Sequence, residues 1–352
     1  MKADNLPGRS FKSGSDEYLY FSGTSYLGMA TNPQFQALIR EGMAIYGSNY
    51  SSSRNSNIQI DIFEKAEAYL AKFTHHESAL TVSSGFMAGQ VVIRSLEKTG
   101  NFYYAPNAHP AVTRSEDDFY TGKYEDWVDQ VIKNHRSIKG EIVLIINSID
   151  PLYVRKNNFD WLHELSKDRK ILVIVDDSHG FGIIGEDGNG ITSAIPGFDH
   201  IEILVLSSFG KAFGVPGGVI LGKSEIINKL RSHPYFGGSS PLVPAYLYAF
   251  IKGFHLYAEA REKLWKNIDC FSSGTANTGF FNTFTCYPVF YTAENALYEY
   301  LLASQVLISS FRYPTQYDDL VTRVVINSNH TSDDLEKLCV LIKAYQNEKE
   351  SN

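Results

Sequence analysis

Short apolar runs recur through the middle of this 352-residue chain, and segments with helical spacing separate them. Runs that are apolar on both faces belong to strands buried on both sides, because helices cover both faces of a parallel sheet. The sequence therefore predicts an α/β fold whose large domain is a mostly parallel sheet covered by helices. The expected strands are residues 79–82, 101–104, 142–146, 171–175, 203–206 and 218–221.

The segments between these runs have apolar residues three and four positions apart, the spacing of one helix face. An earlier helix is expected to start at Pro33, whose fixed φ and missing N–H suit the first helical position. The other expected helices are residues 60–73, 87–97, 125–134, 159–168 and 224–231.

The pattern changes after residue 240. A long helical segment at 243–265 precedes shorter strands at 286–291 and 322–326, and a last helix is expected at 332–346. We interpret this C-terminal part as a smaller α+β domain. The predicted organisation is an N-terminal arm (1–45) that packs with the small domain, a large domain (46–240) and the small domain itself (241–352).

Composition excludes several classes of protein. The net charge of −7 and the lack of a basic run argue against a nucleic-acid binder. The longest apolar stretches are strand-sized and the N-terminus lacks the apolar core of a signal peptide, so we expect no membrane association and a cytoplasmic location. Three widely spaced cysteines predict neither a disulfide framework nor a metal site.

The residues that suggest chemistry follow two of the expected strands. Lys211 lies in the glycine-rich segment Ser-Phe-Gly-Lys-Ala-Phe-Gly, and Asp176 and His179 lie in Asp-Asp-Ser-His-Gly. Both segments come just past strand ends, where ligands gather in parallel sheets. A pyridoxal phosphate (PLP) enzyme needs an amine that forms a Schiff base and a carboxylate for the ring nitrogen. Taken alone, the histidine is more typical of a satisfied structural residue than of a catalytic one.

One glycine motif has to be set aside. Gly-Phe-Gly-Ile-Ile-Gly at 180–185 matches the dinucleotide-binding fingerprint, which should open a helix. The residues that follow it, Glu-Asp-Gly-Asn-Gly, are typical of a loop instead. A dinucleotide site is therefore not predicted.

From about residue 20 to 345 the chain resembles the α-oxoamine synthases, a family of fold-type I PLP-dependent transferases. The resemblance is strongest at 175–190 and 209–214, with weaker echoes at 25–28, 84–89 and 236–241. Its closest motifs are those of the 8-amino-7-oxononanoate synthases and the 2-amino-3-ketobutyrate ligases. The resemblance implies that Lys211 holds PLP, that Asp176 contacts the ring nitrogen and that His179 contacts the ring's phenolic oxygen.

The phosphate of PLP has several expected partners. Ser84, Gly85 and Phe86 open the helix expected after 79–82, and N–H groups at a helix start bind phosphate. A Ser/Gly helix cap without a ligand is the alternative interpretation of this motif. The resemblance adds Ser208 from the same subunit. It also adds a hydroxyl from Ser239 or Ser240 of a neighbouring subunit, which implies a homodimer with shared active sites.

Two further positions depend on the resemblance. His109 matches the family's histidine that stacks on the cofactor ring, although Asn107 competes for the position and His109 before Pro110 is also typical of a turn. Arg323 matches the arginine that clamps the substrate carboxylate, with an exposed arginine on an edge strand as the alternative. At 147–153 the chain departs from the family pattern, in a segment that faces the cofactor in relatives.

The resemblance implies a reaction as well as a fold. We expect a PLP-dependent acyltransferase that condenses a small amino acid with an acyl-CoA thioester to give an α-amino ketone. An aminotransferase or related PLP enzyme that does not use coenzyme A is the first alternative. A non-catalytic protein that kept the fold is the second, and the presence of Lys211, Asp176 and His179 argues against it.

Overall fold

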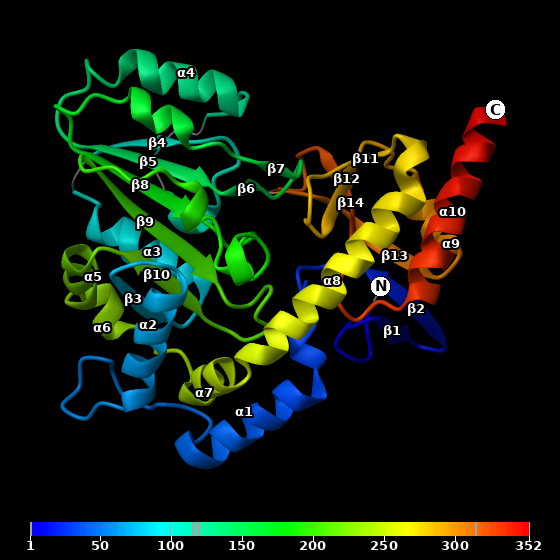
Figure 1. Ribbon diagram of the computed structural model, residues 1–352, viewed down its shortest axis with the longest axis horizontal. Helices are drawn as coiled ribbons and strands as arrows, with labels where there is room; N and C mark the ends of the chain where they lie inside the picture. Colours follow the sequence, from blue (N-terminus) through cyan, green and yellow to red (C-terminus); the bar gives the residue numbers. More distant parts are fainter. Residues whose placement is uncertain (1, 99, 115–116, 118–119, 314, 352) are drawn as a thin grey trace.

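The computed structural model describes residues 2–98, 100–114, 117, 120–313 and 315–351. Within these residues the chain forms two six-stranded sheets and one two-stranded ribbon. Figure 1 shows the two sheets side by side, with the long helix α8 (Phe254–Thr275) running beside both. No described helix has the length and apolar character needed to cross a membrane.

The first sheet contains all six strands that the apolar runs predict. Five strands share one direction, and β10 runs opposite to both of its neighbours. The prediction of a mostly parallel sheet is therefore confirmed. In spatial order the strands are β3 (Ser78–Val82), β10 (Gly218–Gly222), β9 (Ile201–Ser208), β8 (Ile171–Asp176), β5 (Ile142–Asn147) and β4 (Asn101–Tyr104).

Burial on both faces explains why these strands are apolar throughout. Along β5, Leu144 and Ile146 pack into one hydrophobic cluster, whereas Val143 and Ile145 pack into a second. Successive side chains of a strand point to opposite faces, so the two clusters lie on the two sides of the sheet. Helices cover both clusters, as the sequence pattern predicts for a sheet buried on both faces.

Most of the expected helices are present. Asn32 caps the first one, accepting hydrogen bonds from the N–H groups of Gln34 and Phe35, with Pro33 at the first helical position. The helices besides α8 are α1 (Pro33–Tyr46), α2 (Asp61–Phe73), α3 (Gly85–Ser95), α4 (Tyr124–Asn134), α5 (Ser224–Arg231), α6 (Pro234–Gly238), α7 (Pro244–Lys252), α9 (Leu297–Ala303) and α10 (Ser332–Ser351).

Two helix predictions are wrong. Residues 159–168 form only the 3-10 turn η3 (Asp160–Glu164), because the chain becomes extended at Leu165 and the N–H of Ser166 donates to Nε2 of His135 at 2.9 Å. Residues 243–265 form two helices, α7 and α8, that meet at Gly253. A Cβ at Gly253 would lie 3.0 Å from Leu38 of α1, so the break lies where α1 packs closely.

The second sheet joins the two ends of the chain. Strand β2 pairs in parallel with β13, so the N-terminal arm lies in the same sheet as the C-terminal strands. The predicted domain boundaries at 45 and 240 stay predictions. In spatial order the strands are β1 (Ser10–Ser13), β2 (Asp16–Phe21), β13 (Val306–Arg312), β14 (Leu320–Val325), β12 (Val289–Thr292) and β11 (Phe281–Asn282).

A small ribbon connects the two sheets. Strands β6 (Ile149–Asp150) and β7 (Arg155–Lys156) follow β5 and reach toward β12 and β14 (Figure 1). The rings of Tyr153 and Tyr291 are 5.3 Å apart, and the side chain of Asn282 donates to the carbonyl of Tyr153 at 3.0 Å. The segment 147–153, which departs from the family pattern, therefore lies between the two sheets.

Candidate active site

Lys211 lies in a tight turn after β9. Phe209, Ala212 and Phe213 are buried, and they anchor the turn on both sides of the lysine. Burial lowers the pKa of Lys211 to about 8, although the charges of Asp176 and Asp177 act in the opposite direction. A lysine in this position is therefore much closer to a neutral, nucleophilic amine than a surface lysine is.

Asp176 and Asp177 are neighbours with different surroundings. Asp176 is the last residue of β8, remains partly exposed and accepts a hydrogen bond from the N–H of Ser178 at 3.0 Å. Asp177 is buried, accepts from the N–H of Ile191 at 2.9 Å, and has its pKa raised to about 7 by burial. The charge of Asp176 acts on both Lys211 and His109, so Asp176 faces the predicted site.

His179 follows one turn later. Its Nδ1 lies 2.9 Å from the hydroxyl of Tyr26. Burial lowers the pKa of His179 well below its usual range, and the positive charges of Lys211 and Arg323 act in the same direction. The imidazole is therefore neutral at physiological pH and lies within electrostatic range of the lysine.

The start of α3 and the end of β9 form a cradle. Ser84 caps α3, with its Oγ accepting from the N–H of Met87 at 3.0 Å. A Cβ on Gly85 would lie 2.6 Å from Cβ of Ser208 and 3.1 Å from its hydroxyl oxygen, so only glycine allows this approach. The N–H groups of Gly85 and Phe86 belong to the first helical turn, where backbone donors lack helical partners. Together with the Ser208 hydroxyl they suit a phosphate.

Arg323 lies in β14, between β13 and β12, so it is not on an edge strand. It is buried, its guanidinium is 5.0 Å from the ring centre of Phe311, and it donates to the carbonyl of Pro151. None of the ion pairs among the described residues involves it. Its Nε is buried without a hydrogen-bond partner in the described part of the chain. A buried, unpaired guanidinium suits a carboxylate ligand.

The remaining predicted residues, His109, Ser239 and Ser240, form no hydrogen bond with Lys211 among the residues that the structure describes. His109 is exposed, and its Nδ1 accepts from the N–H of Ala111 at 3.1 Å. The charges of Asp176 and Lys211 act on its ring in opposite directions. The hydroxyl of Ser239 donates to the carbonyl of Phe236 at 3.0 Å, and Ser240 is exposed. These contacts tie Ser239 to α6 rather than to Lys211, so the roles of both serines stay predictions.

Sequence reasoning missed Tyr26 and Tyr287. Both are buried, and the charge of Arg323 acts to lower the pKa of each. Tyr26 belongs to the weak motif Ser-Tyr-Leu-Gly, which was the only signal for it, and no motif includes Tyr287. Asn107, the competitor of His109, has a left-handed backbone (φ 59°) and donates to Asp150 at 3.0 Å.

Comparison with known proteins identifies the family of the chain. The family described as aminotransferase class I and II matches residues 139–342, more than half of the chain. The chain belongs to this family. Among the curated relatives, a putative 8-amino-7-oxononanoate synthase from Methanococcus vannielii is 26% identical, over 96% of this chain and 95% of the relative. An 8-amino-7-oxononanoate synthase from Petrotoga mobilis is 28% identical, over 90% and 86%.

Solved structures confirm the fold. A serine palmitoyltransferase from S. paucimobilis, solved with bound PLP, matches with a TM-score of 0.83 at 18% identity, over 97% of this chain and 91% of that one. The 8-amino-7-oxononanoate synthase from Francisella tularensis matches with a TM-score of 0.72 at 21% identity, over 94% and 99%. The expected fold, that of fold-type I PLP-dependent transferases, is confirmed, and so is the resemblance to the α-oxoamine synthases.

Proposed function

We propose that this protein is a PLP-dependent acyltransferase that condenses a small amino acid with an acyl-CoA thioester to give an α-amino ketone, with release of coenzyme A and of the amino acid's carboxylate as carbon dioxide. The observation that supports the proposal is that Lys211 interacts electrostatically with both Asp176 and His179, while Gly85 at the start of α3 lies against Ser208. The curated relatives named 8-amino-7-oxononanoate synthase support the acyl-transfer reaction over other PLP chemistry.

The residues present fit PLP. The amine of Lys211 suits covalent attachment of the aldehyde, and the N–H groups at the start of α3 with Ser208 suit the phosphate. Asp176 suits the ring nitrogen and His179 suits the phenolic oxygen. When bound, PLP withdraws electrons from the bond that breaks at the α-carbon of the substrate.

The residues of the chain have separate roles in the proposed reaction. With PLP bound, the carboxylate of Asp176 would keep a proton on the ring nitrogen, and the neutral imidazole of His179 would donate a hydrogen bond to the ring oxygen. Arg323 binds the carboxylate of the amino acid and orients its α-carbon. Lys211, with a pKa of about 8, accepts the α-proton and later returns it.

We also propose a homodimer in which Ser239 or Ser240 of each subunit reaches the phosphate bound by its neighbour. The resemblance to the α-oxoamine synthases supports this proposal, and the exposed Ser240 after α6 is accessible to a second subunit. A cytoplasmic location is proposed for the same protein. Size-exclusion chromatography with light scattering tests the dimer, and a monomeric, active protein would contradict it.

An aminotransferase that does not use coenzyme A is the second candidate, favoured by the name of the matched family. One experiment separates the two. The PLP-loaded protein is mixed with glycine, alanine or serine, with and without a panel of acyl-CoA thioesters. We expect free coenzyme A thiol and an α-amino ketone only when both substrates are present, and neither with Lys211→Ala. Conversion of PLP to its pyridoxamine form without a thioester would instead support the aminotransferase.

A further inference from the structure

Two buried tyrosines and the half-buried His179 form a continuous hydrogen-bonded chain that ends at the site. The hydroxyl of Tyr26 lies 2.9 Å from Nδ1 of His179, and the same hydroxyl is hydrogen-bonded to Tyr287. The ring of Tyr26 is 6.4 Å from each of the other two rings. Tyr26 and Tyr287 are each 1% exposed, so water does not compete for these contacts.

The direction of the protons follows from the donors available. A phenol has one proton to donate, and its oxygen also accepts. The contact with Tyr26 is the one side-chain hydrogen bond of Tyr287 among the described residues, so the buried proton of Tyr287 is satisfied only if Tyr287 donates to the oxygen of Tyr26. That arrangement leaves the proton of Tyr26 for Nδ1 of His179. A neutral imidazole that accepts at Nδ1 carries its proton on Nε2. The chain of contacts therefore selects one of the two tautomers of His179.

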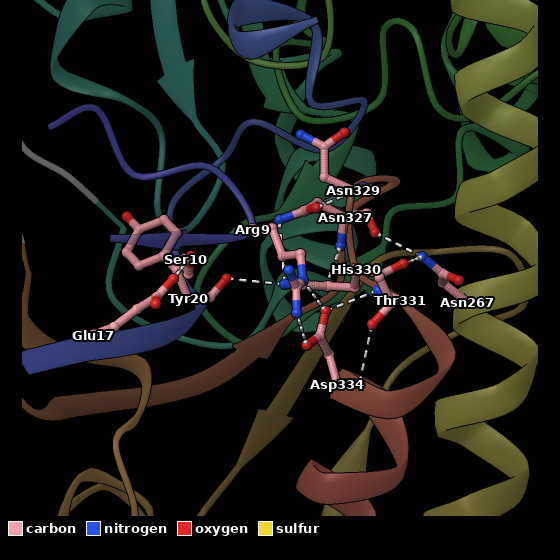
Figure 2. Close-up of polar contacts among 10 residues, drawn as sticks. All are labelled: Arg9, Ser10, Glu17, Tyr20, Asn267, Asn327, Asn329, His330, Thr331 and Asp334. Atoms are coloured by element: carbon pink, nitrogen blue, oxygen red, sulfur yellow. Dashed lines mark hydrogen bonds and ion pairs between the residues drawn. The ribbon is translucent and has the colours of Figure 1, made fainter. Parts of the chain in front are cut away.

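The backbone around Tyr26 is held firmly enough for this role. The N–H of Ser328 donates to the carbonyl of Tyr26 at 3.1 Å, and the side chain of Asn329 donates to that of Gly28 at 3.4 Å. Figure 2 shows His330 beside Tyr20 of the same arm, and its Nε2 lies 3.0 Å from the carbonyl of Tyr20. The loop before α10 thus holds the arm on both sides of Tyr26.

We propose that Tyr26 is a positioning residue that holds His179 in the tautomer with its proton on Nε2, so that this nitrogen donates to the anionic ring oxygen of PLP. The role of the ring oxygen rests on the proposed function, whereas the tautomer is a property of the chain itself. Tyr287 supports the arrangement by occupying the oxygen of Tyr26.

The test reads the tautomer directly. The full-length protein is labelled with ¹⁵N-histidine, the imidazole ¹⁵N shifts are recorded with and without added PLP, and His179→Gln identifies the signals of His179. In the wild-type protein we expect the proton on Nε2 in both samples. In Tyr26→Phe we expect a mixture of the two tautomers. Tyr124→Phe is the matched control, since it removes another hydrogen-bonded phenol, bonded to Asn158 at 2.8 Å, and should leave His179 unchanged.

Two results would overturn the proposal. One is a wild-type His179 with its proton on Nδ1, which needs no variant to fold. The other is a folded Tyr26→Phe protein whose His179 stays entirely in the Nε2 form. As a second readout we expect Tyr26→Phe to bind PLP about tenfold more weakly, the effect of one hydrogen bond to a charged group. A wild-type protein that binds no PLP would contradict the proposed function but would not change the tautomer result.

Discussion

The guanidinium of Arg323 donates a hydrogen bond to the backbone carbonyl of Pro151. Pro151 lies in the 147–153 segment, where the chain departs from the α-oxoamine synthase pattern, and Asp150 acts electrostatically on the same arginine. The unmatched segment therefore touches the predicted carboxylate clamp. We infer that this departure changes how the amino acid is held.

Replacing Arg323 by lysine tests the clamp. Lysine cannot form the paired, planar hydrogen bonds that a guanidinium makes with a carboxylate. We expect Arg323→Lys to raise KM for the amino acid by about 10- to 100-fold, the effect of losing one charged hydrogen bond. PLP affinity, followed by absorbance, should stay unchanged. A KM equal to that of the wild type would rule out the clamp.

Replacing Lys211 by alanine tests the attachment site. We expect Lys211→Ala to lose the covalent adduct that borohydride reduction traps, as read by intact-protein mass spectrometry. Lys223→Ala is the matched control, because Lys223 is an exposed lysine just before α5. If the Lys211→Ala protein still gave the reduced adduct at full yield, the assignment would be wrong.

The pH dependence of cofactor attachment follows from the pKa of Lys211. Only the deprotonated amine attacks the aldehyde of PLP, and burial lowers the pKa of Lys211 to about 8. The rate of attachment should therefore rise with pH and level off above a midpoint near 8. Stopped-flow absorbance on the cofactor-free protein measures it. A midpoint near that of an exposed lysine would contradict the desolvated site.

Paired substitutions distinguish the two adjacent acids. Asp176→Asn removes the negative charge that faces the site, so we expect kcat to fall about 10²-fold or more, the effect of losing a preorganised electrostatic group. Asp177→Asn keeps an oxygen that can accept from the N–H of Ile191, so kcat should fall much less. Steady-state kinetics of both variants decides the matter. The reverse order of effects would move the ring-nitrogen role to Asp177.

The free energy of unfolding should fall in acid because His330 is buried as a neutral group. Burial lowers the pKa of His330 to about 4, against the opposing charge of Asp334, and Arg9 lowers it further. The unfolded histidine binds its proton near pH 6.5, so the stability is complete above that pH and is lost as pH falls toward 4. The upper limit is about 3 kcal/mol.

Urea unfolding between pH 4 and 7 measures this effect. In His330→Asn the slope of the free energy of unfolding against pH should become shallower. It should not vanish, because burial also lowers the pKa of His76 to about 4. An unchanged slope would mean that His330 is already exposed to solvent in the folded protein.

Much of the site was predictable because it lies at the ends of buried strands. The apolar runs before Asp176 and Lys211 identify β8 and β9, and paired parallel strands end at the same edge of a sheet. Ser84 and Gly85 were predictable in the same way, since they begin the helix after β3. Each of these inferences needs only a local pattern and the rule that such edges gather ligands.

Contacts between distant residues were not predictable. Tyr26 meets His179 across 153 positions of sequence, and no periodic pattern relates the two. The end of η3 depends on His135, and the break at Gly253 depends on the packing of α1. At η3 and at Gly253, a neighbouring residue or helix that the fold brings close overrides the local preference for a longer helix.

The sequence by itself determined the parallel sheet, the turn that presents Lys211 and the pairing of that lysine with Asp176, because burial on both strand faces leaves a local signature. Only the tertiary structure decided that Arg323 is buried between two strands and that the hydroxyl of Tyr26 contacts His179. The order of strands in the second sheet, and the return of the N-terminal arm to it, arise from packing between segments that are hundreds of residues apart. Such packing leaves no local pattern in the chain.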